Sequence, residues 1–279
     1  MSPTEQQVRF FDTFGFICFP GLFADATGRI TESFEQVWAD HGGGHHGQAH
    51  DHRRRSGLLQ FIDRNEYLCG LLDDPRIDQF ASAVLGGDYN YKSSDGNLHA
   101  SDTAWHSDAD IPKPTIKAAF YLDEVTADSG CLRVIPGSHK SGDGYATALN
   151  DMVPSIDEQH LEERLGVDGS QVPAVALESR PGDLVCFDRR IKHAAFGGGT
   201  RRRMFTIILE PRHTDEELDS LRENIAVLAR YWLERAYGKL MIETAGPERM
   251  VHLEQRMAND GHLKVLARRA REKMEEPER

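Results

Sequence analysis

Hydrophobic residues change their spacing twice along this chain. In its first third they recur three and four positions apart, as at Ile30, Phe34 and Val37, which is the period of an amphipathic helix. From about Tyr89, short runs with a period near two indicate strands. From Thr214 the helical spacing returns. Short strands between helical portions predict a mainly β fold: a double-stranded β-helix (jelly-roll, cupin-like) core with N-terminal helices and a helical C-terminal extension.

Turn sequences and apolar runs give approximate bounds for these elements. Turns are expected at Asp-Ser-Gly (128–130), Pro-Gly-Ser (136–138) and Pro-Gly-Asp (181–183). The expected strands are 16–19, 89–92, 116–122, 131–135, 172–177, 184–187 and 202–209. The expected helices are 5–13, 25–39, one or two within 66–86, at most one between 143 and 169, and several between 214 and 274.

The length of 279 residues suits one large domain, or one domain with an appendage. We expect residues 1–212 to form the jelly-roll domain with its N-terminal helices. Residues 213–279 are expected to form a helical extension. This extension either packs on the same domain or supplies the interface of a homodimer.

Composition narrows the class of partner. The net charge of −12 argues against nucleic acids and anionic membranes, because binding phosphates needs a positive surface. No apolar run approaches the roughly 18 residues of a membrane-spanning helix. The four cysteines form no close pair, which suits a reducing compartment, and the first residues lack the pattern of a signal peptide. We therefore expect a cytoplasmic protein with a small-molecule substrate.

One short motif has the spacing of a metal site. His106 and Asp108 lie two positions apart, so on an extended segment both side chains point to the same face. The triplet His-x-Asp/Glu is frequent in a sequence this rich in acidic residues, and it recurs at His160, His213 and His252. Those three lie in helical surroundings, where residues two apart do not face each other, or at a helix start. The pair at 106 and 108 is therefore the better candidate.

A second imidazole from another strand would complete this pair. Two His and one carboxylate with open positions form the facial set of non-haem Fe(II) oxygenases. His193 follows a strand that starts at the turn 181–183 and is expected to end near Ile191. It would therefore stand at a strand end, where a side chain reaches the mouth of a barrel.

The segment 41–55 is rich in glycine and histidine. A histidine-rich tract can bind metal, but its glycines provide no rigid scaffold for a ligand set. A mobile loop is therefore the preferred interpretation, with a lid over the metal centre as the alternative.

Four segments occur in a recognisable order between about residues 8 and 210. They are F-x-x-x-G-F-x-x-F-P-G-L-F at 11–23, W-H-S-D at 105–108, F-Y-L-D at 120–123 leading to S-G-C-L-R-V-I-P-G-S-H-K at 129–140, and P-G-D-L-V-C-F at 181–187 leading to His193. Together they resemble the phytanoyl-CoA dioxygenase (PhyH) family of Fe(II)- and 2-oxoglutarate-dependent oxygenases. The resemblance implies that His106, Asp108 and His193 hold Fe(II), with 2-oxoglutarate and O₂ as co-substrates. It also implies that His139, after its Pro-Gly-Ser turn, is structural.

The co-substrate needs a cation. A guanidinium suits the distal carboxylate of 2-oxoglutarate, because it is always charged and pairs with both oxygens. The resemblance places this arginine at the start of the strand after His193. Alternation sends Arg202 and Arg203 to opposite faces of that strand, and Arg202 is the preferred candidate, with Arg203 second. Asn97 and His99, on an expected inner strand, are weaker candidates for the co-substrate or substrate pocket.

The resemblance implies a hydroxylase that couples decarboxylation of 2-oxoglutarate to oxidation of an unactivated C–H bond. Because Asp108 supplies a carboxylate ligand, no coordination position is vacated for a halide, and desaturation or ring closure stay open. The rival from another class is a cupin-like metal-binding isomerase or small-molecule-binding protein without oxygen chemistry. The substrate is not identified by the sequence, although arginines near the expected mouth suggest an anionic group.

Overall fold

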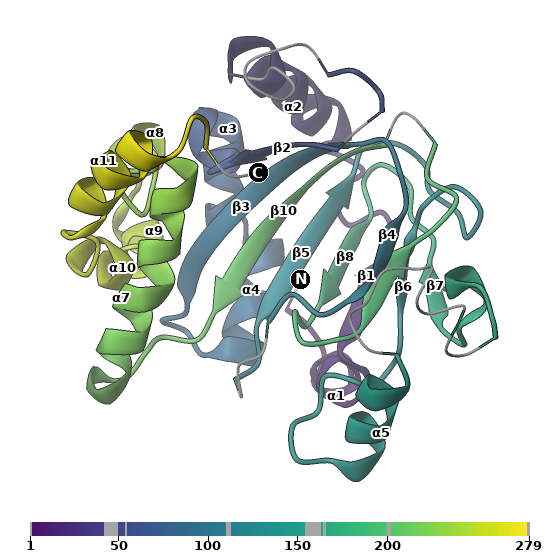
Figure 1. Ribbon diagram of the computed structural model, residues 1–279. Coiled ribbons are helices and arrows are strands. Elements are labelled where there is room, and N and C mark those ends of the chain that lie inside the picture. Colours follow the sequence, from purple (N-terminus) through teal and green to yellow (C-terminus); the bar gives the residue numbers. More distant parts are fainter. Residues whose placement is uncertain are drawn as a thin grey trace.

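Two antiparallel β-sheets form the centre of the molecule (Figure 1). The computed structural model describes residues 2–41, 50–53, 55–109, 113–153, 163, 166–199 and 202–277. Its strands are β1 (Phe16–Phe19), β2 (Ser56–Leu59), β3 (Asn90–His99), β4 (Thr103–His106), β5 (Ile116–Tyr121), β6 (Leu132–Val134), β7 (Val175–Leu177), β8 (Leu184–Phe187), β9 (His193–Ala195) and β10 (Arg202–Glu210). In the described ranges the larger sheet has the order β1-β8-β5-β10-β3-β2, and the smaller sheet has the order β4-β9-β6-β7. The two sheets and the helices around them confirm the predicted jelly-roll architecture.

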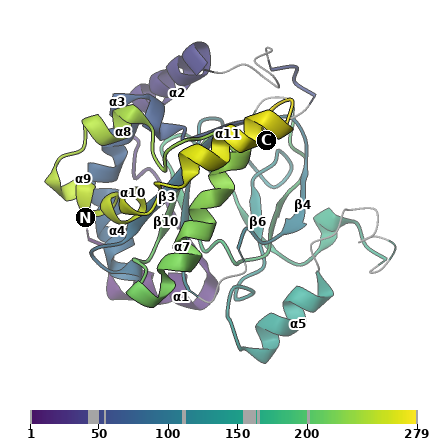
Figure 2. The ribbon, with the colours of Figure 1, turned by 60° about the vertical axis from the view of Figure 1, so that its left-hand side comes forward.

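Helices flank the sheets on several sides (Figures 1 and 2). They are α1 (Glu5–Phe14), α2 (Thr27–His41), α3 (Glu66–Cys69), α4 (Pro75–Leu85), α5 (Gly144–Met152), α7 (Leu218–Ala226), α8 (Lys239–Glu243), α9 (Pro247–Val251), α10 (Glu254–Ala258) and α11 (Leu263–Lys273). Short 3₁₀ segments are η2 (Ile62–Arg64), η3 (Gly70–Asp73), η4 (Gly169–Gln171), η5 (Asp215–Glu217) and η6 (Val227–Tyr231). Among the described residues, no helix combines the length and the apolar character that crossing a membrane requires.

Local sequence signals set the ends of the N-terminal helices. Thr4 and Gln7 form a capping box at the start of α1, since the side chain of each accepts a hydrogen bond from the backbone N–H of the other. Gly15 ends α1 with φ 80°, a left-handed conformation that favours glycine. Asp74 caps α4, and Pro75 follows in the first turn, where its missing N–H costs nothing.

Strand β10 separates a cavity between the sheets from the main hydrophobic core. Alternate side chains of this strand line the cavity: Arg202, Met204, Thr206 and Ile208. The intervening apolar side chains join the core under the N-terminal helices: Phe205, Ile207 and Leu209. The period of two in a strand produces this division.

Aromatic rings connect the N-terminal helices to the outer face of the larger sheet. Phe120 of β5 and Phe205 of β10 stack with ring centroids 4.6 Å apart, and Phe61 stacks on Phe205 at 5.8 Å. Phe34 of α2 contacts Phe61 at 5.0 Å. All four are buried, and such pairs contribute about 0.5–1.5 kcal/mol each beyond the burial of their area.

The C-terminal extension packs on the same chain on the side of β3 (Figure 2). Tyr237 stacks on Tyr91 of β3 with ring centroids 5.3 Å apart, and its hydroxyl donates a hydrogen bond to the carbonyl of Tyr91. Arg256 of α10 and Glu210 of β10 form a buried ion pair at 2.8 Å. The extension is thus tied to the larger sheet by apolar and charged contacts. A homodimer through these helices stays a prediction.

Three expected strands differ from the observed ones. β8 has the expected bounds 184–187 but does not continue to Ile191, and His193 begins the separate strand β9 of the smaller sheet. β3 runs from 90 to 99 because β10 and β2 pair with it on both sides, and this tertiary pairing overrides the weak strand preference of its polar residues. The strand expected from residue 172 starts only at Val175, after the 3₁₀ turn η4.

Asp63, where η2 meets the extension, has an environment that should make stability depend on pH. Its carboxylate accepts hydrogen bonds from the Tyr91 hydroxyl at 2.6 Å and from the Gly238 N–H at 2.8 Å. Burial raises the pKa of Asp63 to about 6, although both hydrogen bonds oppose the shift. The folded protein therefore binds this proton more tightly than the unfolded chain does.

The contribution of this proton to stability is fully present below the unfolded pKa of 3.8 and is lost as the pH rises through about 6. Asp63→Asn removes the titration. From pH 4 to pH 7, we expect the wild type to lose about 2 kcal/mol of unfolding free energy relative to this variant. Urea unfolding followed by circular dichroism at both pH values measures the difference. A difference between the two proteins that does not vary with pH would contradict the assignment.

Candidate metal centre and the surrounding pocket

The structure brings His106, Asp108 and His193 together at the cavity between the sheets. His106 is the last residue of β4, His193 is the first residue of β9, and the two positions are paired directly. One nitrogen or oxygen atom from each of the three side chains lies within 4.8 Å of the others. Three side chains that the sequence analysis grouped by motif are therefore close enough to share one metal ion.

Backbone carbonyls orient both imidazole rings. The Nδ1 atom of His106 lies 2.8 Å from the Ala104 carbonyl oxygen, and the Nδ1 atom of His193 lies 2.9 Å from that of Ile191. A carbonyl oxygen only accepts, so each Nδ1 carries the proton and each Nε2 keeps a free lone pair. The two Nε2 atoms lie 3.5 and 3.8 Å from oxygens of Asp108. Metal-binding histidines commonly have this second hydrogen bond.

Protonation states in the cluster suit a metal ion, which needs a carboxylate and neutral imidazoles. Burial by itself would raise the pKa of Asp108, but nearby positive charge, first that of Lys117, holds that pKa well below its ordinary value. Burial lowers the pKa of His193 to about 4, although Asp108 opposes the shift. Near neutral pH, Asp108 is therefore ionised and His193 is neutral.

Lys117 and Arg189 hold Asp108 from two sides, and neither was expected from the sequence. The Nζ atom of Lys117 lies 2.8 Å from Oδ2 of Asp108. The Arg189 carbonyl accepts a hydrogen bond from the Asp108 N–H at 2.8 Å, and its guanidinium donates to the Asp108 carbonyl at 3.0 Å. A signal for Lys117 existed, since it is the charged residue within the apolar sequence IKAAFY of β5.

Arg202 lines the cavity of about 710 Å³ that adjoins the cluster. Its side chain is almost fully buried, with 3% of the residue exposed. Its Nη1 donates to the Gly130 carbonyl, while its Nε has no hydrogen-bond partner in the described part of the chain. Burial lowers the pKa of Arg202. A buried guanidinium without a carboxylate is costly, so this site favours an incoming anion.

Gly130 makes room for this guanidinium. Its φ is +88°, and a Cβ atom at this position would lie 2.0 Å from Nη1 of Arg202. Both the backbone conformation and the close approach therefore require glycine. The Ser-Gly-Cys sequence, identified above only as part of a motif, thus has a physical role beside Arg202.

Arg203 lies on the opposite face of β10. Its guanidinium contacts Asp123 at 2.6 Å and Glu35 at 2.5 Å. The hydrogen bonds that Arg203 donates to Asp123, together with the one it donates to Glu35, raise the pKa of Arg203 despite burial. Arg203 already has two carboxylate partners away from the cavity, whereas Arg202 faces the cavity.

Asn97 and His99 line the same cavity on β3. The Oδ1 atom of Asn97 accepts a hydrogen bond from Nε of Arg55 at 2.7 Å. His99 is paired in register with Arg202, and burial together with the nearby Arg202 charge lowers the pKa of His99 to about 2. His99 is therefore neutral and adds no positive charge beside Arg202.

The histidine-rich segment is only partly described. Residues 42–49, with His45 and His46, and residue 54 lie outside the described residues, so the lid hypothesis falls outside them as well. The ring of His50 lies 2.8 Å from the Ser56 hydroxyl. His139, for which the resemblance implies a structural role, lies 2.9 Å through Nε2 from the carbonyl of Asp12.

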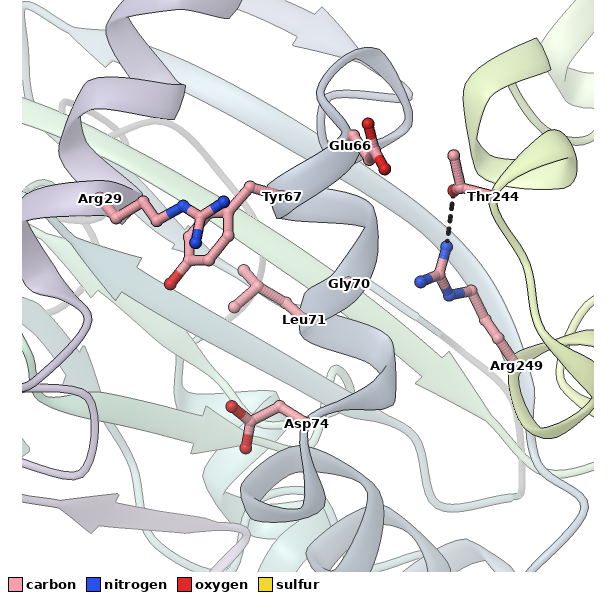
Figure 3. A pocket seen from close by; sticks show the side chains of 8 residues that line it. All are labelled: Arg29, Glu66, Tyr67, Gly70, Leu71, Asp74, Thr244 and Arg249. Carbon is pink, nitrogen blue, oxygen red and sulfur yellow. Dashed lines mark hydrogen bonds between the residues drawn. The ribbon is translucent and has the colours of Figure 1, made fainter.

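A second hollow, of about 460 Å³, lies among the helices outside the larger sheet (Figure 3). Arg249 in its wall pairs with Asp73 and donates to the Thr244 hydroxyl at 3.0 Å. The guanidinium of Arg29 lies 4.1 Å from the centre of the Tyr67 ring. Its cationic groups thus already have partners within the chain, and we assign it no ligand.

Comparison with known proteins bears on the class of this site. The sequence matches the family model described as phytanoyl-CoA dioxygenase (PhyH) over residues 11–204. The chain belongs to the phytanoyl-CoA dioxygenase family. This family comprises Fe(II)- and 2-oxoglutarate-dependent oxygenases, so the protein is an enzyme of that superfamily. A search of curated proteins found no match.

Solved structures share the PhyH fold at low sequence identity. The non-haem α-ketoglutarate-dependent carbocyclase SnoK from nogalamycin biosynthesis has a TM-score of 0.56 and 21% identity, covering 78% of this chain and 91% of that one. EctD from S. alaskensis, solved with 2-oxoglutarate and 5-hydroxyectoine, has a TM-score of 0.55 and 20% identity, covering 75% and 76%. HygX from Streptomyces hygroscopicus, solved with nickel and 2-oxoglutarate, has a TM-score of 0.55 and 16% identity, covering 76% and 88%.

Proposed function

We propose that this protein is an Fe(II)- and 2-oxoglutarate-dependent dioxygenase that hydroxylates an unactivated C–H bond of a small-molecule substrate. The observation that carries the proposal is the cluster of His106, Asp108 and His193 beside the buried guanidinium of Arg202, whose Nε has no hydrogen-bond partner among the described residues. A metal site and an anion site in one cavity are what a 2-oxo acid co-substrate needs.

The donor set fits Fe(II). Two imidazole nitrogens and one carboxylate can occupy one face of a metal ion and leave the other positions open. Lys117 holds Oδ2 of Asp108, while Oδ1 is directed toward His106. When bound, iron and 2-oxoglutarate supply the O₂-dependent decarboxylation to succinate that drives substrate oxidation.

Arg202 is proposed to bind the distal carboxylate of 2-oxoglutarate, with Nε among its free donors. Tyr121 lines the same cavity, and its hydroxyl adds a donor. His99 lines the same cavity and, being neutral beside Arg202, does not repel the guanidinium. Asn97 also lines the cavity, where its side chain accepts a hydrogen bond from Arg55.

The reaction outcome is proposed to be hydroxylation, because Asp108 fills the position that a halide would need. The fold relatives include a carbocyclase and an epimerase, so ring closure and epimerisation are the alternatives that product analysis decides. Desaturation belongs to the same group. Hydroxylation and these three alternatives would all use the same metal and co-substrate residues, and they differ only in the product formed from the substrate.

The test uses purified protein with Fe(II), 2-oxoglutarate and O₂ against a panel of metabolites. We expect succinate formation that requires Fe(II) and increases with the true substrate, and a product that gains one oxygen atom. Loss of two hydrogen atoms would indicate desaturation or ring closure instead, and an unchanged mass with inverted configuration would indicate epimerisation. Either result would overturn hydroxylation while keeping the oxygenase.

The rival proposal is a cupin-like metal-binding isomerase or small-molecule-binding protein. Two imidazoles and a carboxylate also bind Zn(II), so the donor set alone does not separate the two. A protein that binds zinc tightly and never consumes 2-oxoglutarate would support the rival. We expect neither nucleic acid nor membrane as a partner.

A further inference from the structure

The far wall of the cavity is built by a part of the chain that follows the segment matched by the PhyH family model. Tyr231, Leu233 and Pro277 of the C-terminal extension line the cavity together with Leu58 and Leu59 of β2. The extension therefore does more than cover the sheet, because it contributes directly to the space in which a substrate can lie.

This wall is fixed in place. The side-chain amide of Gln60 donates to the carbonyls of Arg235 and Ala236 at 2.9 and 3.1 Å. Asp63 accepts from the Gly238 N–H, as described above. β2 and η2 are thereby joined to the segment that follows Leu233.

Trp232 lies between two of the lining residues in a strained conformation. Its φ is 59°, which a bulky side chain rarely adopts. The Trp232 N–H donates to the Ala229 carbonyl at 3.0 Å, and the Leu233 N–H donates to that of Leu228 at 3.3 Å. Such strain is often found at ligand sites, and here it accompanies a turn that presents Tyr231 and Leu233 to the cavity.

The cavity is rich in positive charge although the chain as a whole carries a net charge of −12. The basic side chains that line it are Arg55, Arg64, Lys117, Arg189 and Arg202. The carboxylates that line it are Asp95 and Asp108. Lys117 is paired with Asp108, and Arg202 is assigned to the co-substrate. Three arginines, Arg55, Arg64 and Arg189, then remain beside one carboxylate, Asp95, so the rest of the cavity carries excess positive charge.

Arg64 is the arginine best placed for a substrate group. It is half-buried in η2, and its Nε and Nη2 both donate to the single carbonyl of Leu59, at 3.3 and 3.2 Å. Among the described residues Arg64 forms no ion pair, and the carboxylate of the neighbouring Asp63 accepts its hydrogen bonds from Tyr91 and Gly238. Burial lowers the pKa of Arg64 although the charge of Asp63 opposes the shift, so the guanidinium is only partly compensated.

We propose that the substrate is an oxyanion with an apolar body, whose carboxylate or phosphate group pairs with Arg64 and whose apolar body lies against Tyr231 and Leu233. This inference rests on the proposed function for the identity of the reaction, but its binding geometry can be tested separately. The hydrogen bonds to Leu59 leave Nη1 and the second N–H of Nη2 as two parallel donors for an oxyanion, and the leucine and tyrosine side chains exclude water from the rest of the ligand.

The test measures binding to protein reconstituted with iron and saturating 2-oxoglutarate under anaerobic conditions, by isothermal titration calorimetry. The probes are matched pairs: octanoate against octanamide, 3-phenylpropanoate against 3-phenylpropanamide, and octyl phosphate against octanol. We expect at least one acid to bind better than its neutral counterpart. Whether carboxylates or the phosphate show the larger preference identifies the oxyanion.

Arg64→Gln should weaken binding of the preferred acid roughly ten- to a hundredfold and leave its neutral counterpart unchanged. Arg180→Gln, which removes the same charge at an exposed position outside the cavity, should leave both unchanged. If Arg64→Gln fails to fold, Leu233→Glu and Leu233→Lys replace it. We then expect the acid-to-neutral affinity ratio to fall in the first and not in the second.

Acids that bind no better than their neutral counterparts, or an acid preference that Arg64→Gln leaves intact, would overturn the inference. The proposed function fails separately, through absence of Fe(II)-dependent succinate formation. Normal succinate formation without acid preference would reject the inference alone, and acid binding through Arg64 without succinate formation would reject the proposed function alone.

Discussion

Replacement of His106 by alanine is expected to abolish iron binding and the turnover of 2-oxoglutarate. The variant removes one of two imidazole ligands and leaves Asp108 and His193 with an incomplete set. Mutation of a residue that merely supports a metal ligand commonly lowers metal affinity or activity about 10- to 100-fold. Loss of the ligand itself should therefore lower them more than about 100-fold. Iron content after anaerobic reconstitution, with succinate formation from the same sample, measures both effects.

His262→Ala is the matched control for this variant. His262 lies in the C-terminal extension, and its ring nitrogen contacts the Arg222 carbonyl at 3.0 Å, away from the cavity. The control should bind iron and form succinate like the wild type. Full iron content in His106→Ala would exclude this residue as a ligand and remove the basis of the proposed function.

Replacement of Arg202 by alanine is expected to preserve iron binding and to weaken the binding of 2-oxoglutarate. The guanidinium is buried, and its Nε has no partner in the described part of the chain. Removing one partner of a buried, hydrogen-bonded charge pair costs about 2–5 kcal/mol, which corresponds to roughly 30-fold to several thousandfold in affinity. The apparent KM for 2-oxoglutarate and the iron content of the same preparation separate the two effects.

Arg203→Ala provides the contrast at the neighbouring position. Its guanidinium is bound to Asp123 and Glu35 on the other face of β10, so we expect a loss of stability and an unchanged KM for 2-oxoglutarate. The melting temperature and KM of both variants distinguish the roles. An increase in KM for Arg203→Ala with a normal KM for Arg202→Ala would show that the register assignment is wrong by one residue.

Much of the candidate site is predictable from the sequence because its chemistry is encoded locally. The spacing of His106 and Asp108 on an extended segment, in a non-helical context, selects one triplet among four. The ordered motifs then indicate His193 as the third ligand and point to the PhyH family; the match over residues 11–204 confirms the family. Strand alternation by itself also places Arg202 and Arg203 on opposite faces of one strand.

Other features depend on contacts that no local pattern encodes. Strand alternation places the side chains of Arg202 and Arg203 on opposite faces of β10 but does not say which face meets the cavity. The pairing of β10 with β3 and β5 decides that. The sequence predicts a continuous strand before His193, but the chain crosses to the smaller sheet after β8. Pairing partners far away in sequence override weak local preferences.

The sequence by itself determined the class of fold, the family and the set of side chains able to bind a metal, because residue type and local spacing are enough to specify them. Only the tertiary structure decided that Arg202 faces the cavity, that Lys117 and Arg189 hold Asp108, and that the C-terminal extension lines the pocket beside Arg64. These features join residues far apart along the chain, so they come into existence only when the sheets and the extension pack together.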